Sequence, residues 1–375
     1  MRIMTVFGTR PEAIKMAPVV KQLQSHKDIE SFCCVTGQHR ELLQQVLDIF
    51  DIVPDINLDV MQPNQNLSEL SAKILLGVSG AIAKFKPDLV LVHGDTTTTF
   101  MATLSAFYAQ VPVGHVEAGL RTGNLYSPWP EEANRKLTGA IARFHFAPTE
   151  FAADNLRREG VDPKTIMMTG NTVIDALHLA IKKIDATPAI SAKTLQNLPV
   201  LAKVGKKILV TGHRRENFGK PFENICNALR TTASDWPDVD IIYPMHLNPN
   251  VREPVLRLLS DKPNIHLLPP LEYLTFIDVM RRMDLIVTDS GGLQEEGAAL
   301  RKPVLVMRDT TERGEAVATG AVRLIGTEEA SIAEGIKTLL DNPVQRAAMQ
   351  NAINPFGDGT AAAKIVKFIQ ANLKT

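Results

Sequence analysis

The sequence predicts an α/β fold of two doubly wound, parallel-sheet domains that face a central cleft. Its 375 residues exceed the length at which a single hydrophobic core usually stops growing, so two domains are expected. Short apolar runs alternate with longer segments of helical periodicity, which is typical of strands joined by crossover helices. The same alternation restarts after residue 206. Each half is therefore predicted to form a Rossmann-like domain.

The first half contains apolar strand patterns separated by amphipathic helices. Pro11 stands at the start of the first helix, where a backbone N–H would have no partner within the helix, so its absence in proline costs no hydrogen bond. The strands are predicted at 3–7, 32–35, 89–92, 111–116, 144–147 and 165–168. The helices are predicted at 12–23, 42–50, 67–84, 131–142 and 151–158.

The second half repeats the pattern after a weakly periodic stretch at 182–206, which contains Pro188 and Pro199 and which we interpret as a linker. Strands are predicted at 208–210, 240–243, 265–268, 285–288, 304–307 and 322–325, and helices at 222–229, 251–259, 276–282 and 291–300. The expected domains are 1–181 and 207–360. A C-terminal helix at 361–375 is expected to pack back on the N-terminal domain.

The composition is that of an ordinary globular protein, with 45% hydrophobic and 22% charged residues. Lys plus Arg and Asp plus Glu both total 41, so the net charge gives no general reason to bind nucleic acid or an anionic membrane. No apolar run approaches the roughly 20 residues of a membrane span. The first residues lack a signal-peptide pattern. Cys33, Cys34 and Cys226 are expected to be buried thiols. Together these features predict a cytoplasmic protein.

A glycine turn and two cations follow the first strand. Gly8 precedes a helix start whose N–H groups can bind an anion, and Arg10 and Lys15 stand beside it. An ordinary solvated helix start is the alternative. Neither G-x-G-x-x-G nor the P-loop pattern occurs, so nicotinamide and P-loop nucleotide binding lack their usual fingerprints.

A second glycine pair opens a helix after the strand at 285–288. Gly291 and Gly292 follow Ser290 and allow the backbone to approach a diphosphate, and Glu296 could accept hydrogen bonds from ribose hydroxyls. Arg308 and Arg313 stand at another strand end. Paired across the cleft with the cations of the first domain, this region is interpreted as a nucleoside diphosphate site.

Three carboxylates stand at strand or helix ends of the first domain, where ligands bind in such sheets. Asp95 follows His93-Gly94, Glu117 follows His115-Val116, and Glu131 follows Ser127-Pro128-Trp129-Pro130. Asp95 and Glu131 could instead be helix caps. His213 ends the first strand of the second domain and is expected to face these acids. The histidines, cysteines and acids show no metal-ligand spacing, so metal-free chemistry is predicted.

These motifs together resemble the non-hydrolysing UDP-N-acetylglucosamine 2-epimerases over essentially the whole chain. In the first half the resemblance rests on F-G-T-R-P-E-A-I-K-M-A-P, Q-H-R, V-H-G-D-T-T-T-T, G-H-V-E-A-G-L-R-T, S-P-W-P-E-E-A-N-R and G-N-T-V-I-D-A-L. In the second half it rests on G-H-R-R-E-N, Y-P-M-H-L-N-P-N-V-R-E-P, T-D-S-G-G-L-Q-E-E and M-R-D-T-T-E-R.

The resemblance implies a glycosyltransferase-B-like fold that interconverts UDP-GlcNAc and UDP-ManNAc without NAD or a metal. The catalytic set it implies is Asp95, Glu117, Glu131 and His213. The UDP-binding set it implies is Arg10, Lys15, Phe276, Ser290, Gly291, Gly292, Glu296 and Arg313, with Phe276 near the uracil. The reaction it implies eliminates UDP to give 2-acetamidoglucal and then adds UDP back. The sequence does not say which acid performs which proton transfer.

The resemblance also implies regulation, assembly and a role. Bacterial relatives are often activated by a second UDP-GlcNAc, and the residues in the matching segments are Gln38, Glu132, Arg215 and His246. Relatives are commonly homodimers, for which the apolar-faced helix at 67–84 is a candidate interface. The product is expected to supply ManNAc units for surface polysaccharide synthesis.

Three alternatives share this fold. A hydrolysing 2-epimerase would release free ManNAc and UDP. A glycosyltransferase that uses a UDP-sugar would need an acceptor site, for which no segment is apparent. A non-catalytic nucleotide-sugar sensor would not need the acids.

Overall fold

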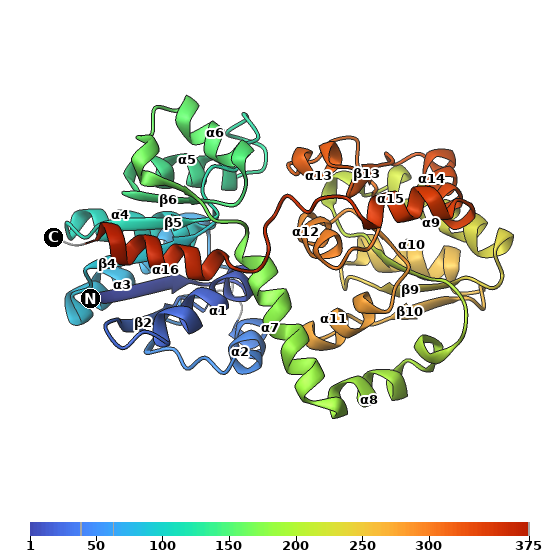
Figure 1. Cartoon of the computed structure of the whole chain (residues 1–375), viewed down its shortest axis with the longest axis horizontal. Helices are drawn as coiled ribbons and strands as arrows, with labels where there is room; N and C mark the ends of the chain where they lie inside the picture. The colour runs from blue at the N-terminus through green and yellow to red at the C-terminus, as the bar shows by residue number, and fades with distance from the viewer. Residues whose placement is uncertain (38–39, 63, 374–375) are drawn as a thin grey trace. The chain divides into compact units, whose positions relative to one another are not determined.

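The computed structural model describes residues 1–37, 40–62 and 64–373, and it divides the chain into two compact units (Figure 1). The first unit comprises 1–179 and 356–375, and the second comprises 180–355. Each unit has its own parallel sheet and its own core.

Seven parallel strands form the sheet of the first unit, in the order β3-β2-β1-β4-β5-β6-β7. The strands are β1 (Arg2–Phe7), β2 (Glu30–Val35), β3 (Ile56–Asn57), β4 (Leu89–His93), β5 (Val113–Val116), β6 (Phe144–Ala147) and β7 (Ile166–Met168). The helices are α1 (Arg10–Gln24), α2 (Arg40–Ile49), α3 (Leu67–Phe85), α4 (Thr97–Tyr108), α5 (Glu131–Ile141), α6 (Glu150–Arg158), η1 (Pro163–Thr165) and α16 (Ala361–Asn372), and α7 (Thr172–Ala186) begins in this unit and ends in the second. The order reverses at β1 and β4, which is where a doubly wound sheet binds its ligand.

Six parallel strands form the sheet of the second unit, in the order β10-β9-β8-β11-β12-β13. The strands are β8 (Lys207–Thr211), β9 (Asp240–Pro244), β10 (Ile265–Leu268), β11 (Leu285–Thr288), β12 (Val304–Val306) and β13 (Val322–Leu324). The helices are α8 (Pro188–Asn197), η2 (Pro199–Ala202), η3 (Arg215–Asn217), α9 (Lys220–Asp235), α10 (Pro249–Leu259), α11 (Tyr273–Arg281), α12 (Gly291–Ala299), α13 (Gly314–Ala318), α14 (Glu329–Asp341) and α15 (Pro343–Gln350). Both sheets confirm the two Rossmann-like domains that the sequence predicts.

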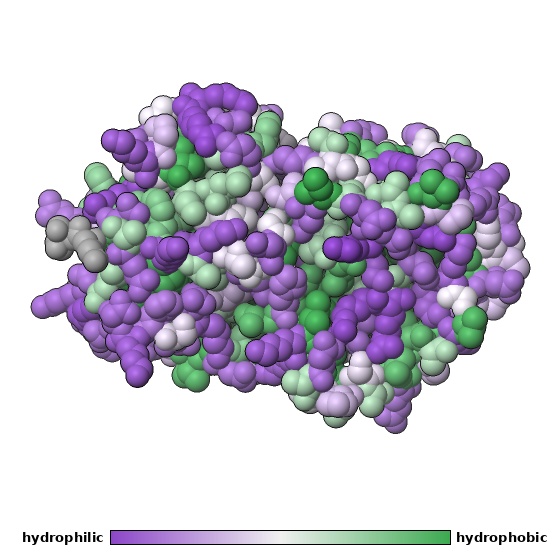
Figure 2. All heavy atoms as spheres, in the orientation of Figure 1, coloured by the Kyte–Doolittle hydropathy of each residue, from purple (hydrophilic) through white to green (hydrophobic). Residues whose placement is uncertain are grey.

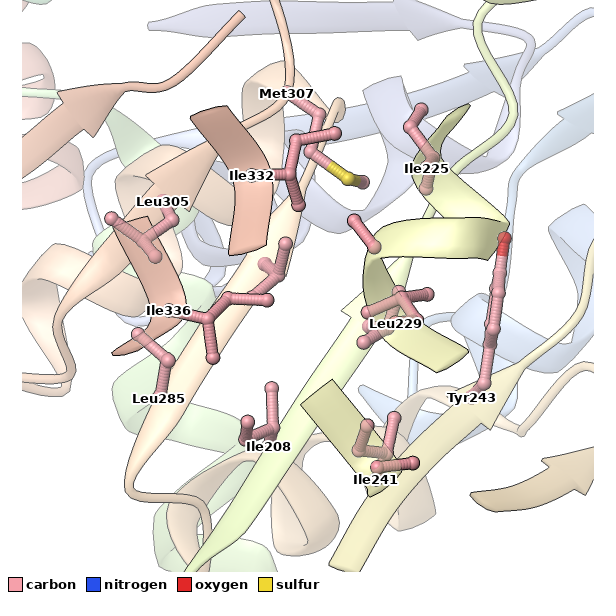
Figure 3. Close-up of a cluster of buried hydrophobic side chains, with 14 of the residues drawn as sticks. Ile208, Ile225, Leu229, Ile241, Tyr243, Leu285, Leu305, Met307, Ile332 and Ile336 are labelled. Atoms are coloured by element: carbon pink, nitrogen blue, oxygen red, sulfur yellow. The ribbon is translucent and has the colours of Figure 1, made fainter. Parts of the chain in front are cut away.

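The core of the second unit lies between its sheet and the helices α9 and α14. Figure 3 shows Ile225 and Leu229 of α9 and Ile336 of α14 beside the strand residues Ile208 and Ile241. All five side chains are fully buried. Burying an aliphatic side chain of this size contributes about 1.5–3 kcal/mol, so this layer fixes the sheet whose strand ends carry the polar residues described below.

The C-terminal helix α16 belongs to the first unit. The backbone N–H groups of Ala361 and Ala362, at its start, donate to the buried carboxylate of Asp175 in α7 at 3.2 and 2.9 Å. Further along, Phe368 makes edge contacts with Phe144 and Phe146 of β6. In Figure 1, α16 lies across strands of the first unit that are far from it in the sequence.

The segment 182–206, which the sequence indicates as a linker, contains the end of α7, helix α8 and η2, and it lies within the second unit. Pro188 and Pro199 each stand in the first turn of their helix, where proline is tolerated. Ser191 of α8 donates to the buried Asp278 carboxylate of α11 at 2.9 Å. The two prolines therefore mark helix starts within a packed segment.

Within the described residues, no helix is both long enough and apolar enough to cross a membrane. Hydrophilic residues cover most of the face drawn in Figure 2, with hydrophobic residues in patches between them. Cys33, Cys34 and Cys226 are buried free thiols, as predicted.

Candidate active site

A buried carboxylate, Glu12, holds the loop after strand β1. Thr9 caps helix α1 by accepting from the Glu12 backbone N–H, and the Glu12 side chain accepts from the N–H groups of Gly8 and Thr9 at 3.0 and 2.7 Å. This reciprocal pair of bonds is a capping box. The other Glu12 oxygen accepts from the Thr96 hydroxyl at 2.7 Å, and Thr96 caps helix α4. Glu12 thus ties the starts of α1 and α4 together.

The two cations of α1 differ in their surroundings. Lys15 Nζ donates to Glu117 Oε2, and the two side chains are only 13% and 8% exposed. Arg10, half-buried at the first position of the helix, pairs with no other side chain in the described part of the chain. Lys15 therefore serves to hold Glu117, while Arg10 remains available to an anion.

Glu117 follows strand β5 in a left-handed backbone conformation, with φ +62°. Its Oε2 atom also accepts from Asn171 Nδ2 at 3.2 Å and lies 3.4 Å from His93 Nε2. Burial alone would raise the pKa of Glu117, but Lys15 and His93 outweigh burial and hold the pKa well below its ordinary value. Glu117 is therefore an ionised carboxylate in a fixed position.

Asp95 leaves the sheet at the same edge, because β4 and β5 pair with His93 opposite Val116. Gly94, before it, has φ +70°, and the Gly94 carbonyl oxygen lies 2.7 Å from His115 Nε2. Burial lowers the pKa of His115 to about 3, so the ring is neutral and Nε2 carries the proton that Gly94 accepts. His115 thus fixes the peptide that leads into Asp95.

An ion-pair network joins Asp95 to helix α5. The Asp95 carboxylate accepts from Arg135 Nη2, and Arg135 Nη1 donates to Glu132 Oε2 at 3.1 Å. Glu132 is fully buried and also accepts from the backbone N–H groups of Thr122 and Gly123, both at 3.1 Å. Glu132, a candidate second-site residue, thus binds three donors of its own chain.

Glu131 has different surroundings from Asp95 and Glu117. It is the first residue of α5, and its Oε2 atom is buried without a hydrogen-bond partner among the described residues. A buried carboxylate oxygen that lacks a donor is costly, so such an oxygen calls for an explanation. A proton or a ligand group bound there would supply the missing partner.

In the second unit, His213 and Asp289 follow the neighbouring strands β8 and β11. Asp289 Oδ2 accepts from the backbone N–H groups of His213 and Arg214, each at 2.8 Å. Asp289 Oδ1 lies 3.4 Å from His213 Nδ1. The His213 ring stacks on that of His246, with centroids 5.5 Å apart. Partial burial lowers the pKa of His213, an effect that the Asp289 carboxylate opposes.

The helix start after β11 lies next to Arg313. Ser290 is the N-cap of α12, and among the described residues no side-chain hydrogen bond caps the helix there. A Cβ atom on Gly291 would lie 2.8 Å from Arg313 Nη1, whereas one on Gly292 would meet no atom of the described residues within 4 Å. Glu295 accepts from Arg313 Nε at 2.9 Å and so fixes the guanidinium there. Free N–H groups and a cation at one helix start form an anion-binding arrangement.

Two further predicted ligands lie near α11. Glu296 accepts from the hydroxyl of Tyr273 at 3.3 Å, and Phe276 is half-buried on the same helix as Tyr273. Arg308 binds Glu216 at 2.8 Å and Glu312 at 2.9 Å. Arg308 is thus committed to carboxylates.

Burial would raise the pKa of Glu312, but Arg308 and Arg313 outweigh burial and lower it to about 2.

Arg215 and His246, two of the candidate second-site residues, are exposed in the second unit. Gln38 lies outside the described residues.

Apart from Lys15, the sequence does not single out the residues that hold the candidate acids and His213. Asn171 and Arg135 contact Glu117 and Asp95 from distant positions in the chain, and Asp289 contacts His213 from the next strand. All three stand within motifs that carry the family resemblance. The family motifs therefore contain these residues, but the spacing of residues within a motif does not reveal contacts between residues that are far apart in the chain.

Comparison with known proteins identifies the family. Residues 21–370 match the family model described as UDP-N-acetylglucosamine 2-epimerase. The chain is 56% identical over 370 residues to the probable UDP-N-acetylglucosamine 2-epimerase of Ralstonia nicotianae, covering 99% of each chain. It is 54% identical over 372 residues to the UDP-N-acetylglucosamine 2-epimerase of Escherichia coli K12, again covering 99% of each chain.

The fold is also that of solved relatives. The crystal structure of UDP-GlcNAc 2-epimerase from Neisseria meningitidis, bound to UDP-GlcNAc, matches with a TM-score of 0.94 and 50% identity, covering 99% of this chain and 100% of that one. This likeness confirms the predicted glycosyltransferase-B-like fold class. The chain therefore belongs to the UDP-N-acetylglucosamine 2-epimerase family, and it is an isomerase.

Proposed function

We propose that this enzyme interconverts UDP-GlcNAc and UDP-ManNAc by eliminating UDP and adding it back, without net hydrolysis. The observation that carries the proposal is the set of three carboxylates of the first unit, two after neighbouring strands and one at the start of α5, each in a different environment. Glu117 is fixed by Lys15, Asp95 is paired with Arg135, and Glu131 has an oxygen with no hydrogen-bond partner among the described residues.

The chemistry requires the bond at C1 to break first. The hydrogen on C2 is not adjacent to a carbonyl, so an ordinary carboxylate cannot remove it from the intact sugar. Departure of UDP leaves an oxocarbenium-like centre at C1 that acidifies this hydrogen, and its removal gives 2-acetamidoglucal. Reprotonation on the opposite face and return of UDP give the epimer. No net oxidation occurs, so the route needs no hydride acceptor.

The surroundings of the acids support different roles for them. Glu117 stays ionised beside Lys15, and a carboxylate with a depressed pKa is a weak base, so we assign it to stabilising positive charge near C1. Glu131 has an oxygen without a donor among the described residues, so we assign it to proton transfer at C2. Asp95, whose side chain is 29% exposed, is assigned to the opposite face.

UDP departure needs concentrated positive charge at the diphosphate. We assign that role in the second unit to Arg313 and the start of α12, with His213 as a further donor. In the first unit, Arg10 has a guanidinium that is not committed to another side chain of the described chain.

Gly291, which lies against the Arg313 guanidinium, provides a test of the UDP site. Gly291→Ala should weaken UDP binding by about 10- to 100-fold, the value of one charge-assisted hydrogen bond, because the new Cβ would displace Arg313. Isothermal titration with UDP measures this change. Gly314→Ala is the matched control, because a Cβ there meets no atom within 4 Å in the part of the chain that the structure describes. Equal UDP affinity in the two variants would contradict the assignment of Arg313.

The reaction itself is tested by incubating the protein with UDP-GlcNAc in D2O and following the sugar by NMR. UDP-ManNAc that carries deuterium at C2 is the expected product. Free ManNAc and UDP would instead identify a hydrolysing 2-epimerase. Binding of UDP-GlcNAc without exchange at C2 would overturn the proposal and favour a transferase or a sensor.

A further inference from the structure

Asp289 is a fully buried carboxylate whose two oxygens have different surroundings. Oδ2 accepts three hydrogen bonds, from the backbone N–H groups of His213 and Arg214 at 2.8 Å and from Asn217 Nδ2 at 3.2 Å. Oδ1 has no hydrogen-bond partner among the described residues. The three donors on Oδ2 fix the plane of the carboxylate, so Oδ1 cannot rotate toward another donor.

The imidazole of His213 could supply the hydrogen-bond donor that Asp289 Oδ1 lacks among the described residues. Its Nδ1 atom lies 3.4 Å from Asp289 Oδ1, within range of an ion pair but long for a hydrogen bond. Stacking on His246, with an interplanar angle of 15°, restrains the tilt of the ring. A proton on Nδ1 would satisfy Oδ1 after a small approach of the ring, whereas a lone pair there would face a carboxylate.

We propose that Asp289 is the positioning residue of His213: it keeps a proton on Nδ1, so that Nε2, on the far side of the ring, is the atom that takes up a second proton and then donates it in a hydrogen bond to the diphosphate. The inference depends on the proposed function only for the identity of the ligand group that contacts His213 Nε2. Asp289 also favours the charged form of the ring, in which Nε2–H can donate to an anion while Nδ1–H donates to Asp289. The same carboxylate fixes the loop through the two backbone N–H groups, so loop and ring move together.

The proposal predicts a specific tautomer in the wild-type protein. The ¹⁵N NMR spectrum of histidine-labelled enzyme, with His213 assigned through the His213→Asn variant, should show neutral His213 with its proton on Nδ1. A proton on Nε2 would overturn the proposal. This measurement needs neither turnover nor an Asp289 variant, so it stands even if such a variant does not fold or if the epimerase assignment fails.

Asp289→Asn should reverse the tautomer. The amide oxygen is needed by the backbone N–H groups of His213 and Arg214, which leaves the NH2 group directed at His213 Nδ1. That group can donate only to an unprotonated Nδ1, so the neutral ring carries its proton on Nε2, and the charged ring, which needs protons on both nitrogens, loses the carboxylate that supports it. We expect kcat for UDP-GlcNAc to fall about 10²-fold, in the range of a lost acid–base or orienting group, with a much smaller change in KM.

A double-mutant cycle separates positioning from a general structural effect. If Asp289 acts through His213, adding Asp289→Asn to His213→Asn should cause little further loss of kcat. Fully additive losses would overturn the proposal. Asp240→Asn is the matched control, because Asp240 accepts from His266 Nε2 at 2.7 Å in the same sheet, away from the loop that carries His213. This variant should perturb only the His266 signals and leave kcat unchanged.

Discussion

Glu131→Gln is expected to abolish exchange at C2 while leaving UDP binding and the fold intact. Glutamine keeps the size of the side chain, and the buried Oε2 of Glu131 makes no internal hydrogen bond within the described residues that the substitution would break. The variant would lack only a group able to take and return a proton. Loss of such a group costs about 10²- to 10⁴-fold in rate. Deuterium incorporation at C2, measured by NMR at saturating UDP-GlcNAc, gives the effect.

Glu150→Gln provides the matched control. Glu150 is the first residue of α6, as Glu131 is of α5, so both substitutions remove one negative charge from a helix N-terminus. Only the Glu131 variant should lose exchange. Wild-type exchange in Glu131→Gln would remove this residue from the mechanism, and loss of UDP binding together with exchange would indicate a structural role.

Glu117→Gln is expected to destabilise the first unit by about 3–5 kcal/mol, the usual effect of breaking one partner of a buried ion pair. Lys15 would lose its carboxylate partner, and because its side chain is only 13% exposed, water could solvate the remaining charge only partly. Urea denaturation of the variant and the wild type measures the difference. The double variant Lys15→Met, Glu117→Gln should lose less than the sum of the two single changes, because neither charge then remains buried without the other. An additive double variant would show that the pair is not coupled.

The effect of Glu117 should depend on pH in a defined direction. Because the folded-state pKa lies well below the ordinary value of 4.5, the carboxylate stabilises the fold above pH 4.5 and loses that effect as the pH falls toward the folded-state pKa. The stability difference between wild type and Glu117→Gln should therefore be full at neutral pH and shrink in acid. A constant difference would contradict the depressed pKa.

Polar residues that follow a strand directly were predictable from the sequence. Asp95, Glu117 and Ser290 stand after apolar runs, and parallel strands bring their carboxyl ends to one edge of a sheet. The capping box of Thr9 and Glu12 is also a local pattern. Such features depend on residues a few positions apart, which is the range over which periodicity and capping rules act.

Contacts over long sequence separations were not predictable. Lys15 and Glu117 are 102 positions apart, and nothing in the motif around Lys15 distinguishes a lysine that binds phosphate from one that holds a carboxylate. The prolines and weak periodicity of the α8 segment are typical of a linker, and they do not reveal a helix that is stabilised by packing on α11. The sequence does not predict helix α4, since the helix begins with a run of threonines of low helix propensity, which the Thr96 cap offsets.

The attachment of α16 to Asp175 has a consequence for the order in which the chain is made. The second unit is one continuous segment, inserted between residue 179 and residue 356 of the first. A ribosome therefore completes every residue of the second unit before it releases the helix whose Phe368 covers Phe144 and Phe146. The first sheet, although synthesised first, must wait with part of its apolar surface uncovered until synthesis has passed through the whole of its neighbour.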